Sequence, residues 1–271
     1  MSASPAPVGT AFVGCGNLGM AILSRAIACG ALQAASTVVV ERDAARRAQA
    51  AALGARTTED AAAARDAELV VLAVKPQSFP EAAHAIGALD AGQLAVSVMA
   101  GHSSSAIRAA LGGAVRVVRA MPNTPAQVGM ATTAVAAGAG ATAQDVAEVR
   151  RIFGAIGRTV EIPERLVDAA VAVVGSGPAY LFLLAEAEIA TAIAMGFSPE
   201  AAREMVTGTL LGAATLLEAD GRSARELRAA VTSAGGTTAA AVRVFEERGF
   251  VDAVGAAMEA ARARSAELSG G

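Results

Sequence analysis

Three glycines near the amino terminus have the spacing of a phosphate-binding loop. Gly14, Gly16 and Gly19 form a G-x-G-x-x-G pattern between a short strand-like run at 10–13 and the helical pattern MAILSRAIA. In that context the first glycine permits a tight turn, the second lets the backbone approach a pyrophosphate, and the third lets helix pack on strand. The amides at the helix start would bind the phosphates. The pattern therefore predicts dinucleotide binding.

A second set of chemically capable residues lies in the stretch VTSAGGTTAA at 231–240, within a region otherwise rich in alanine. Four residues with hydroxyl side chains, Thr232, Ser233, Thr237 and Thr238, lie on either side of the paired glycines Gly235 and Gly236. The residues alone leave two interpretations open. The stretch is an ordinary corner between two helices, or it is a helix start whose amides and hydroxyls bind an anion.

Charged residues follow two of the predicted strands. Lys75 is the single lysine among 22 basic residues, and we expect its ammonium group beside a nicotinamide ribose or phosphate. At the end of the second strand, Glu41 would hydrogen-bond the adenosine ribose of NAD, whereas Arg42 would receive the 2′-phosphate of NADP. Both residues are present, so the choice between NADH and NADPH stays open.

No acid–base dyad and no metal site is expected. His84 and His102 lie in separate predicted segments without a third ligand at metal spacing, and neither is expected to be catalytic. Cys15 and Cys29 lack paired spacing, and the opening MSASPAPVG lacks the basic region of an export signal. A reducing, cytoplasmic location is therefore expected.

Alternating strand and helix patterns predict the elements that position these residues. Strands are expected at 10–13, 37–40, 55–56, 68–74, 94–98, 116–119 and 132–137, and helices at 44–53, from Asp60, and at 142–156. Such alternation predicts an α/β fold with a doubly wound (Rossmann) sheet. Ligands bind such sheets at the C-terminal ends of the strands. Five loops fall there, at 14–19, 41–42, 73–76, 99–101 and 121–125.

The second half of the chain is predicted to be all-helical. Strand–helix alternation stops near Pro163, and helices are expected at 164–174, 178–195, 199–218, 223–231 and 238–264. We therefore expect a dinucleotide-binding domain at 1–162 and a helical substrate-binding and dimerisation domain at 163–271. The apolar faces of these helices are wider than one partner needs, which indicates a subunit interface.

Composition argues against two classes of partner. With 3% aromatic residues, a net charge of −3 and no run of basic residues, the chain has no pattern typical of nucleic-acid binding. The most apolar stretch, 166–195, contains Asp168, Glu186 and Glu188 and is interrupted by GSGP at 175–178. Charges and a helix breaker are costly at membrane depth. We therefore predict a buried helix of a soluble protein there, and no membrane partner.

Taken together, VGCGNLG, LAVKP, RAMPNTP, GSGPAY and VTSAGGTT closely resemble the motifs of pyrroline-5-carboxylate reductases, in order and spacing over essentially the full length. The resemblance implies reduction of 1-pyrroline-5-carboxylate to L-proline with NADPH or NADH, the last step of proline biosynthesis. It also implies a Rossmann domain followed by a helical domain that intertwines with a second subunit, giving a homodimer or an assembly of dimers.

The resemblance assigns roles to individual residues. Implied cofactor-binding residues are Gly14, Cys15, Gly16, Asn17, Leu18, Gly19, Arg42, Asp60, Ala73, Val74, Lys75, Pro76, Ala100, Gly101, Pro122 and Asn123. Implied substrate-binding residues are Ser233, Gly235, Gly236, Thr237 and Thr238. The amides of the glycine pair and Thr237 would hold the substrate carboxylate, and Thr238, the catalytic candidate, would contact the ring nitrogen. A protonated iminium is already electrophilic, so no strong acid is required.

Some positions depart from the family pattern. Ala234 stands where the family usually has proline, Ala229 and Ala230 replace a polar pair, and Met130 and Ala131 replace Glu-Gly.

The alternatives to a pyrroline-5-carboxylate reductase are a related reductase of another small cyclic imine or hydroxy acid, or a non-catalytic dinucleotide-binding protein. A β-hydroxy acid enzyme would need a catalytic lysine on the first long helix of the second domain. The single lysine, Lys75, lies in the first domain, so the sequence disfavours that alternative.

Overall fold

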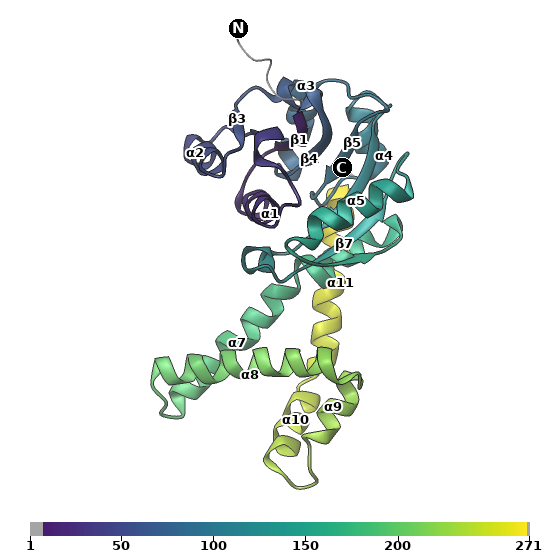
Figure 1. Cartoon of the computed structure of the whole chain (residues 1–271). Coiled ribbons are helices and arrows are strands. Elements are labelled where there is room, and N and C mark those ends of the chain that lie inside the picture. Colours follow the sequence, from purple (N-terminus) through teal and green to yellow (C-terminus); the bar gives the residue numbers. More distant parts are fainter. Residues whose placement is uncertain (1–7, 270–271) are drawn as a thin grey trace. The chain divides into compact units, whose positions relative to one another are not determined.

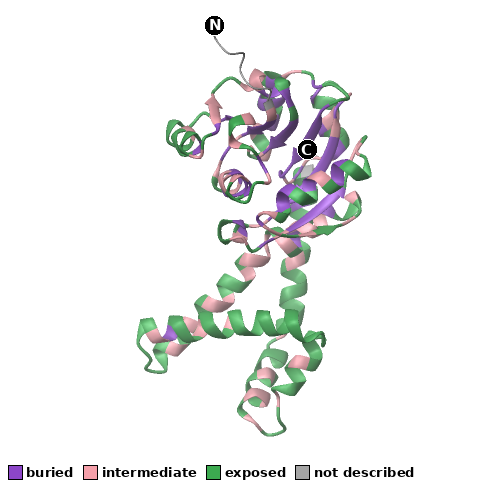
Figure 2. Ribbon diagram, in the orientation of Figure 1, coloured by how far each residue is buried: buried purple, intermediate pink, exposed green. Residues whose placement is uncertain are grey.

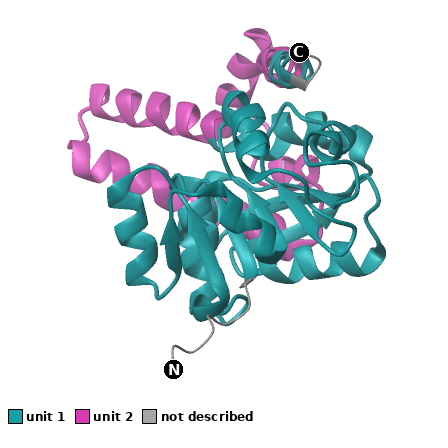
Figure 3. Ribbon diagram, turned by 90° about the horizontal axis from the view of Figure 1, so that it is seen from above, with its two compact units in different colours: residues 1–178, 260–271 teal, residues 179–259 magenta. Residues whose placement is uncertain are grey.

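The computed structural model describes residues 8–269 and divides into two compact units (Figure 1). Unit 1 comprises Met1–Pro178 with Ala260–Gly271, and unit 2 comprises Ala179–Glu259 (Figure 3). The compact units separate after residue 178, whereas the domain boundary expected from sequence lies after residue 162 and stays a prediction.

Unit 1 is built on an eight-stranded sheet with the order β3-β2-β1-β4-β5-β6-β7-β8. The strands are β1 Val8–Val13, β2 Thr37–Val40, β3 Arg56–Thr58, β4 Ala67–Leu72, β5 Leu94–Ser97, β6 Arg116–Met121, β7 Ala131–Ala137 and β8 Gly157–Glu161. Neighbouring strands are parallel except β6 and β7, which are antiparallel. The doubly wound α/β class is confirmed, whereas β8 and the reversal of β7 were not foreseen.

Helices cover both faces of the sheet because successive strand residues point to opposite sides. On one face, Phe12 and Val71 pack with α1 (Asn17–Ala28) and α5 (Ala143–Gly154) in one buried cluster. On the other face, Ala11 and Val70 pack with α3 (Phe79–Ile86) and α4 (Ser104–Ala110). The helix α2 (Ala44–Ala52) flanks the sheet beside β2 and β3. The central strands β2, β4 and β5 are therefore buried on both sides along nearly their whole length, which explains the continuous apolar runs.

Several short helical segments connect these elements. The 3₁₀ segments are η1 Ala34–Ser36, η2 Ala61–Asp66, η3 Pro76–Ser78, η4 Thr124–Val128 and η5 Glu164–Leu166. The helix expected from Asp60 is thus the 3₁₀ segment η2. The helix expected at 164–174 consists of η5, the α-helical turn α6 Val167–Ala170 and the π-helical turn η6 Val171–Gly175.

Unit 2 is all-helical, as expected from the sequence. Its helices are α7 Gly177–Ala194, α8 Pro199–Asp220, α9 Ala224–Ala230, α10 Thr237–Glu247 and α11 Phe250–Ser269, the last of which ends in unit 1. The expectation of one helix at 238–264 is wrong. Gly249 adopts a φ of 68°, a left-handed conformation that ends α10 and separates it from α11.

The apolar stretch 166–195 was predicted to be buried, but most of it is exposed or only half-buried. Residues of α7 are exposed or only partly buried along its length (Figure 2), and Leu183 exposes 68% of its surface. Within the part of the chain that the structure describes, Glu164–Ala194 is a helical run long and apolar enough to cross a membrane by length and composition alone. The prediction failed because the helices of unit 2 do not supply enough surface to cover this one. An exposed apolar face of this size is typical of an interaction surface.

The start of β8 provides a test of the sheet edge. Gly157 has a φ of 149°, and a Cβ there would overlap the Ala131 carbonyl of β7. We expect Gly157→Ala to lower the free energy of unfolding by at least about 2 kcal/mol in urea titration. Gly154→Ala, three residues earlier in open space at the end of α5, is the matched control. It should leave stability equal or higher, since alanine favours a helix. Equal losses in both variants would contradict this account.

Candidate functional site

The glycine loop lies where β1, β2 and β4 end together. Val13 is paired with Val40 on one side and Leu72 on the other, so the three carboxyl ends are level. Gly14 adopts a φ of 82°, and a Cβ on it would lie 2.9 Å from the Ala73 carbonyl oxygen. Gly19 is similarly close to the loop, since its Cβ would lie 3.2 Å from the Gly14 carbonyl oxygen. Only glycine satisfies both the dihedral angle and the contact at Gly14.

The helix that follows the loop can bind an anion. Gly16 is the N-cap of α1, and no side chain caps this helix start. Its first amides therefore keep their hydrogen-bonding capacity and the positive end of the helix dipole. A hollow of about 410 Å³ lies against Cys15, Gly16 and Asn17 and includes Arg46 in its lining. The residues present thus fit a pyrophosphate.

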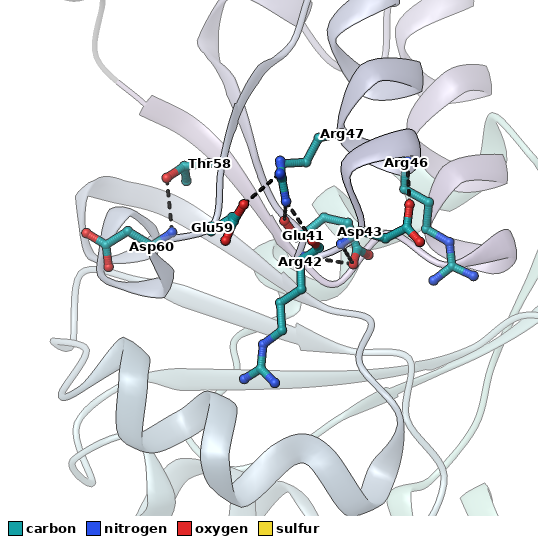
Figure 4. Close-up of polar contacts among 8 residues, drawn as sticks. All are labelled: Glu41, Arg42, Asp43, Arg46, Arg47, Thr58, Glu59 and Asp60. Atoms are coloured by element: carbon teal, nitrogen blue, oxygen red, sulfur yellow. Dashed lines mark hydrogen bonds and ion pairs between the residues drawn. The ribbon is translucent and has the colours of Figure 1, made fainter.

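Glu41, which follows β2 and is drawn in Figure 4, holds the glycine loop in place through the Cys15 amide. Its Oε2 accepts a hydrogen bond of 2.7 Å from the Cys15 amide, and its Oε1 accepts from the amides of Arg42 and Asp43 at 2.8 and 3.0 Å. The charge of one carboxylate therefore organises two backbone segments. Sequence reasoning expected Glu41 to serve the ribose and gave no sign of this contact with the loop.

Arg42 and Asp60 lie on the same side of the site, in separate contacts. The guanidinium of Arg42 is exposed and forms an ion pair of 2.6 Å with Glu81 on α3. Asp60 instead accepts a hydrogen bond of 2.9 Å from the Ala62 amide and caps η2. The nearby Arg47 pairs with Glu59 at 2.6 Å (Figure 4). Arg42 therefore lies in the segment that flanks the glycine loop. The Asp60 side chain makes its contact within η2 instead.

The loops after β4 and β5 are tied to each other. Ala73 and Val74 contact Gly14, and Lys75 is exposed just before η3. His102 Nε2 lies 3.0 Å from the Pro76 carbonyl oxygen, which accepts a hydrogen bond when the imidazole is protonated at Nε2. The imidazole ring also packs on Phe79. The contact with Pro76 links the loop after β5 to the loop after β4. The segment Ala73–Pro76 is therefore fixed beside the residues that follow β5.

The remaining expected cofactor residues belong to the loops after β5 and β6. Ala100 packs against a buried cluster beside β6, and Gly101 adopts a φ of 79° where a Cβ would lie 2.9 Å from the Leu268 carbonyl oxygen. Pro122 follows β6 directly. The Oδ1 atom of Asn123 accepts a hydrogen bond of 3.0 Å from the Thr132 amide. The Asn123 side chain therefore holds the start of β7.

The predicted substrate residues gather in unit 2. Gly235 has a φ of 71°, and Gly236 is the N-cap of α10, a helix start that no side chain caps. A Cβ on Gly236 would lie 2.5 Å from the Ser233 hydroxyl oxygen, so this hydroxyl rests directly on the glycine. Thr237 and Thr238 form the first turn of α10. The arrangement is a glycine-lined helix start with hydroxyls beside it, suited to a carboxylate.

Burial and the neighbouring Glu41 carboxylate raise the pKa of the Cys15 thiol from 9.0 to about 12. The folded chain therefore keeps this proton between pH 9 and 12, whereas the unfolded chain releases it. The stabilisation is fully present below pH 9 and is lost as the pH rises through this window, by about 1.4 kcal/mol per pH unit. Cys15→Ala should remove that component from urea titrations between pH 8.5 and 10.5, and Cys29→Ala should retain it. Identical slopes for all three proteins would contradict the shift.

Comparison with known proteins covers both halves of the chain. Residues 164–268 match the family model described as pyrroline-5-carboxylate reductase dimerisation, and residues 10–101 match the model described as NADP oxidoreductase, coenzyme F420-dependent. The pyrroline-5-carboxylate reductase of Mycobacterium tuberculosis (strain ATCC 25618 / H37Rv) is 40% identical, covering 95% of this chain and 96% of that protein. The Vibrio alginolyticus reductase is 37% identical with the same coverage.

Solved structures agree. The pyrroline-5-carboxylate reductase of Coxiella burnetii has a TM-score of 0.85 at 31% identity and covers 97% of this chain and 99% of that one. The Plasmodium falciparum enzyme, solved with NADP bound, has a TM-score of 0.85 at 25% identity, covering 98% and 100%. A reductive aminase of Aspergillus terreus, at 18% identity and a TM-score of 0.58, shares the fold. This chain therefore belongs to the pyrroline-5-carboxylate reductase family.

Proposed function

We propose that this protein reduces 1-pyrroline-5-carboxylate to L-proline with NAD(P)H, as the last step of proline biosynthesis. The observation that carries the proposal is that one chain, similar to the reductases along its whole length, holds both required sites. Unit 1 provides a glycine loop that fits a pyrophosphate, and unit 2 provides an uncapped, glycine-lined helix start. The proposed domains are a dinucleotide-binding domain at 1–162 and a helical domain at 163–271.

The residues of unit 1 bind and orient the cofactor. The amides of Asn17, Leu18 and Gly19 at the start of α1 hold the pyrophosphate, and Glu41 keeps their loop rigid. Ala73 to Pro76, Ala100, Gly101 and Asn123 line the nicotinamide side, with Lys75 supplying one positive charge. When bound, the reduced nicotinamide supplies a hydride to the imine carbon.

The loop of unit 2 binds the substrate. The amides of Gly235, Gly236 and Thr237 hold the carboxylate at the positive end of α10, and the Ser233 hydroxyl supports it. The Thr238 hydroxyl oxygen accepts a hydrogen bond from the N–H of the protonated ring nitrogen and so orients the imine carbon toward the hydride. The nitrogen is already protonated in the iminium, so addition of hydride alone gives the neutral amine of proline.

The assay that tests this function follows NADPH and NADH oxidation at 340 nm with pyrroline-5-carboxylate as substrate. Turnover with at least one cofactor, with proline identified as the product, supports the proposal. No turnover with either cofactor overturns it.

Thr238→Ala should lower kcat/KM for pyrroline-5-carboxylate by about 10- to 100-fold, because a hydrogen bond to a charged nitrogen is lost. The dissociation constant for NADPH should stay nearly unchanged. Thr232→Ala is the matched control, since Thr232 is equally half-buried and its hydroxyl donates instead to the Arg228 carbonyl oxygen at 2.6 Å. Equal losses of turnover and cofactor binding in Thr238→Ala would show that Thr238 has another role.

The partner that covers α7 is proposed to be a second copy of this chain, forming a homodimer or an assembly of dimers through the C-terminal helices. The match to a dimerisation family over 164–268 and the exposed apolar side chains of α7 support this. A second subunit over the apolar side chains of α7 would shield them from water, so no membrane is required to do so. The net charge of −3 disfavours binding of nucleic acid. A cytoplasmic location fits both points.

Light scattering at micromolar concentration should therefore give at least twice the mass of the chain. Leu183→Glu on α7 should reduce that mass, since an ionised carboxylate would be buried in the interface. Val128→Glu is the matched control, because Val128 is equally exposed, at 68%, but is the last residue of η4 in unit 1. A monomeric wild type, or equal effects of the two variants, would contradict the proposed interface.

A further inference from the structure

The segment after β2 holds two residues that favour different cofactors, and the structure separates their roles. Both oxygens of the Glu41 carboxylate accept backbone hydrogen bonds, from Cys15 on one side and from Arg42 and Asp43 on the other. Its negative charge is therefore compensated by amides within the fold. The group left to discriminate between NADH and NADPH is the exposed guanidinium of Arg42.

Arg42 already has an anionic partner. Its Nη2 lies 2.6 Å from Glu81 Oε1, and the two side chains are 72% and 65% exposed. The hydrogen bond to Glu81 and the attraction of its charge raise the pKa of Arg42 above the usual arginine value. The guanidinium extends away from Glu41 and Arg47 (Figure 4). The guanidinium of Arg42 is thus paired with Glu81 on α3 and not with the neighbouring Glu41.

The position of the ion pair explains why a cofactor would meet it. In the sheet, β2 and β4 lie on either side of β1, so the segments after them flank the glycine loop. Arg42 belongs to the first of these segments, and Glu81 lies on α3, which follows the second. The pair therefore joins the two sides of the crevice in which such sheets bind a nucleotide.

The backbone that carries Glu81 is fixed in place by its buried neighbours. Phe79, two residues before it, is buried, as are Ala82 and Ala83 directly after it. The backbone of α3 is therefore anchored beneath the carboxylate. A phosphate that took Arg42 from Glu81 would remain close to that negative charge, and the two would repel each other.

We infer that Glu81 is a specificity-determining residue that competes with the 2′-phosphate of NADP(H) for the guanidinium of Arg42. NADPH binding exchanges the carboxylate, which Arg42 holds through a single Nη2–Oε1 contact, for a phosphate that carries a larger negative charge and can accept from both ends of the guanidinium. NADH binding leaves the ion pair intact. Glu81 thus lowers the preference for NADPH that Arg42 would otherwise give. This inference deepens the proposed function and rests on it.

The test measures binding of two adenosine fragments to the full-length protein by calorimetry: adenosine 2′,5′-bisphosphate and adenosine 5′-monophosphate. Glu81→Gln keeps the size of the side chain and removes its charge. It should tighten binding of the bisphosphate about two- to fivefold, the range expected for an exposed ion pair, and leave the monophosphate unchanged. Adding Glu81→Gln to Arg42→Ala should change nothing further, because the contested cation is gone.

Glu59→Gln is the matched control. Glu59 is 66% exposed and pairs with Arg47 at the same distance of 2.6 Å, but Arg47 also donates hydrogen bonds to the carbonyl oxygens of Glu41 and Arg42. This control removes one negative charge from the same region without freeing Arg42. Equal tightening by the two glutamine variants would overturn the inference, as would a Glu81→Gln effect that persists without Arg42 or that appears equally with the monophosphate.

Failure of the inference and failure of the proposed function are distinguishable, because fragment binding requires no turnover. Binding of both fragments with no effect of Glu81→Gln overturns only the role of Glu81. Binding of neither fragment overturns the nucleotide site itself, and with it both proposals.

Discussion

The contact between Gly14 and the backbone after β4 is the constraint on which the cofactor half of this molecule depends. A side chain on Gly14 would collide with Ala73 and Val74, so the loop after β1 can rest on its neighbour only as glycine. The level carboxyl ends of β1, β2 and β4 make that approach possible, and Glu41 fixes the other side of the loop. The uncapped amides at the start of α1 are therefore oriented by the sheet, without help from capping side chains.

The two units obtain their stability in different ways. Unit 1 buries its strands between helices on both faces and resembles a complete domain. Unit 2 leaves large aliphatic and aromatic side chains of α7, α8 and α11 exposed, among them Phe182, Leu211 and Val251. A soluble chain rarely exposes so much apolar surface unless another surface covers it. Association through the proposed interface would cover this apolar surface and so stabilise unit 2.

The sequence predicted those features that local patterns encode, and it missed those that depend on distant contacts. The glycine loop, the parallel strands and the helical second half were predictable from spacing and periodicity. The strand at 157–161 was missed because it forms by pairing with β7, and the break at Gly249 was missed because alanine-rich periodicity continues past it. Likewise, Glu41 and Arg42 were recognised by type. Their partners Cys15 and Glu81 lie 26 and 39 residues away, and only the fold reveals them.

The single lysine has a practical consequence. Every other basic side chain is arginine, so Lys75 is the one ε-amino group that amine-directed reagents can reach. It is exposed next to Pro76, on the edge of the sheet that carries the glycine loop. Apart from the α-amino group, fluorescent dyes, cross-linkers and coupling resins aimed at amines would thus attach beside the nucleotide crevice. Immobilisation through thiols should use the exposed Cys29 instead, at the far end of α1 from that loop.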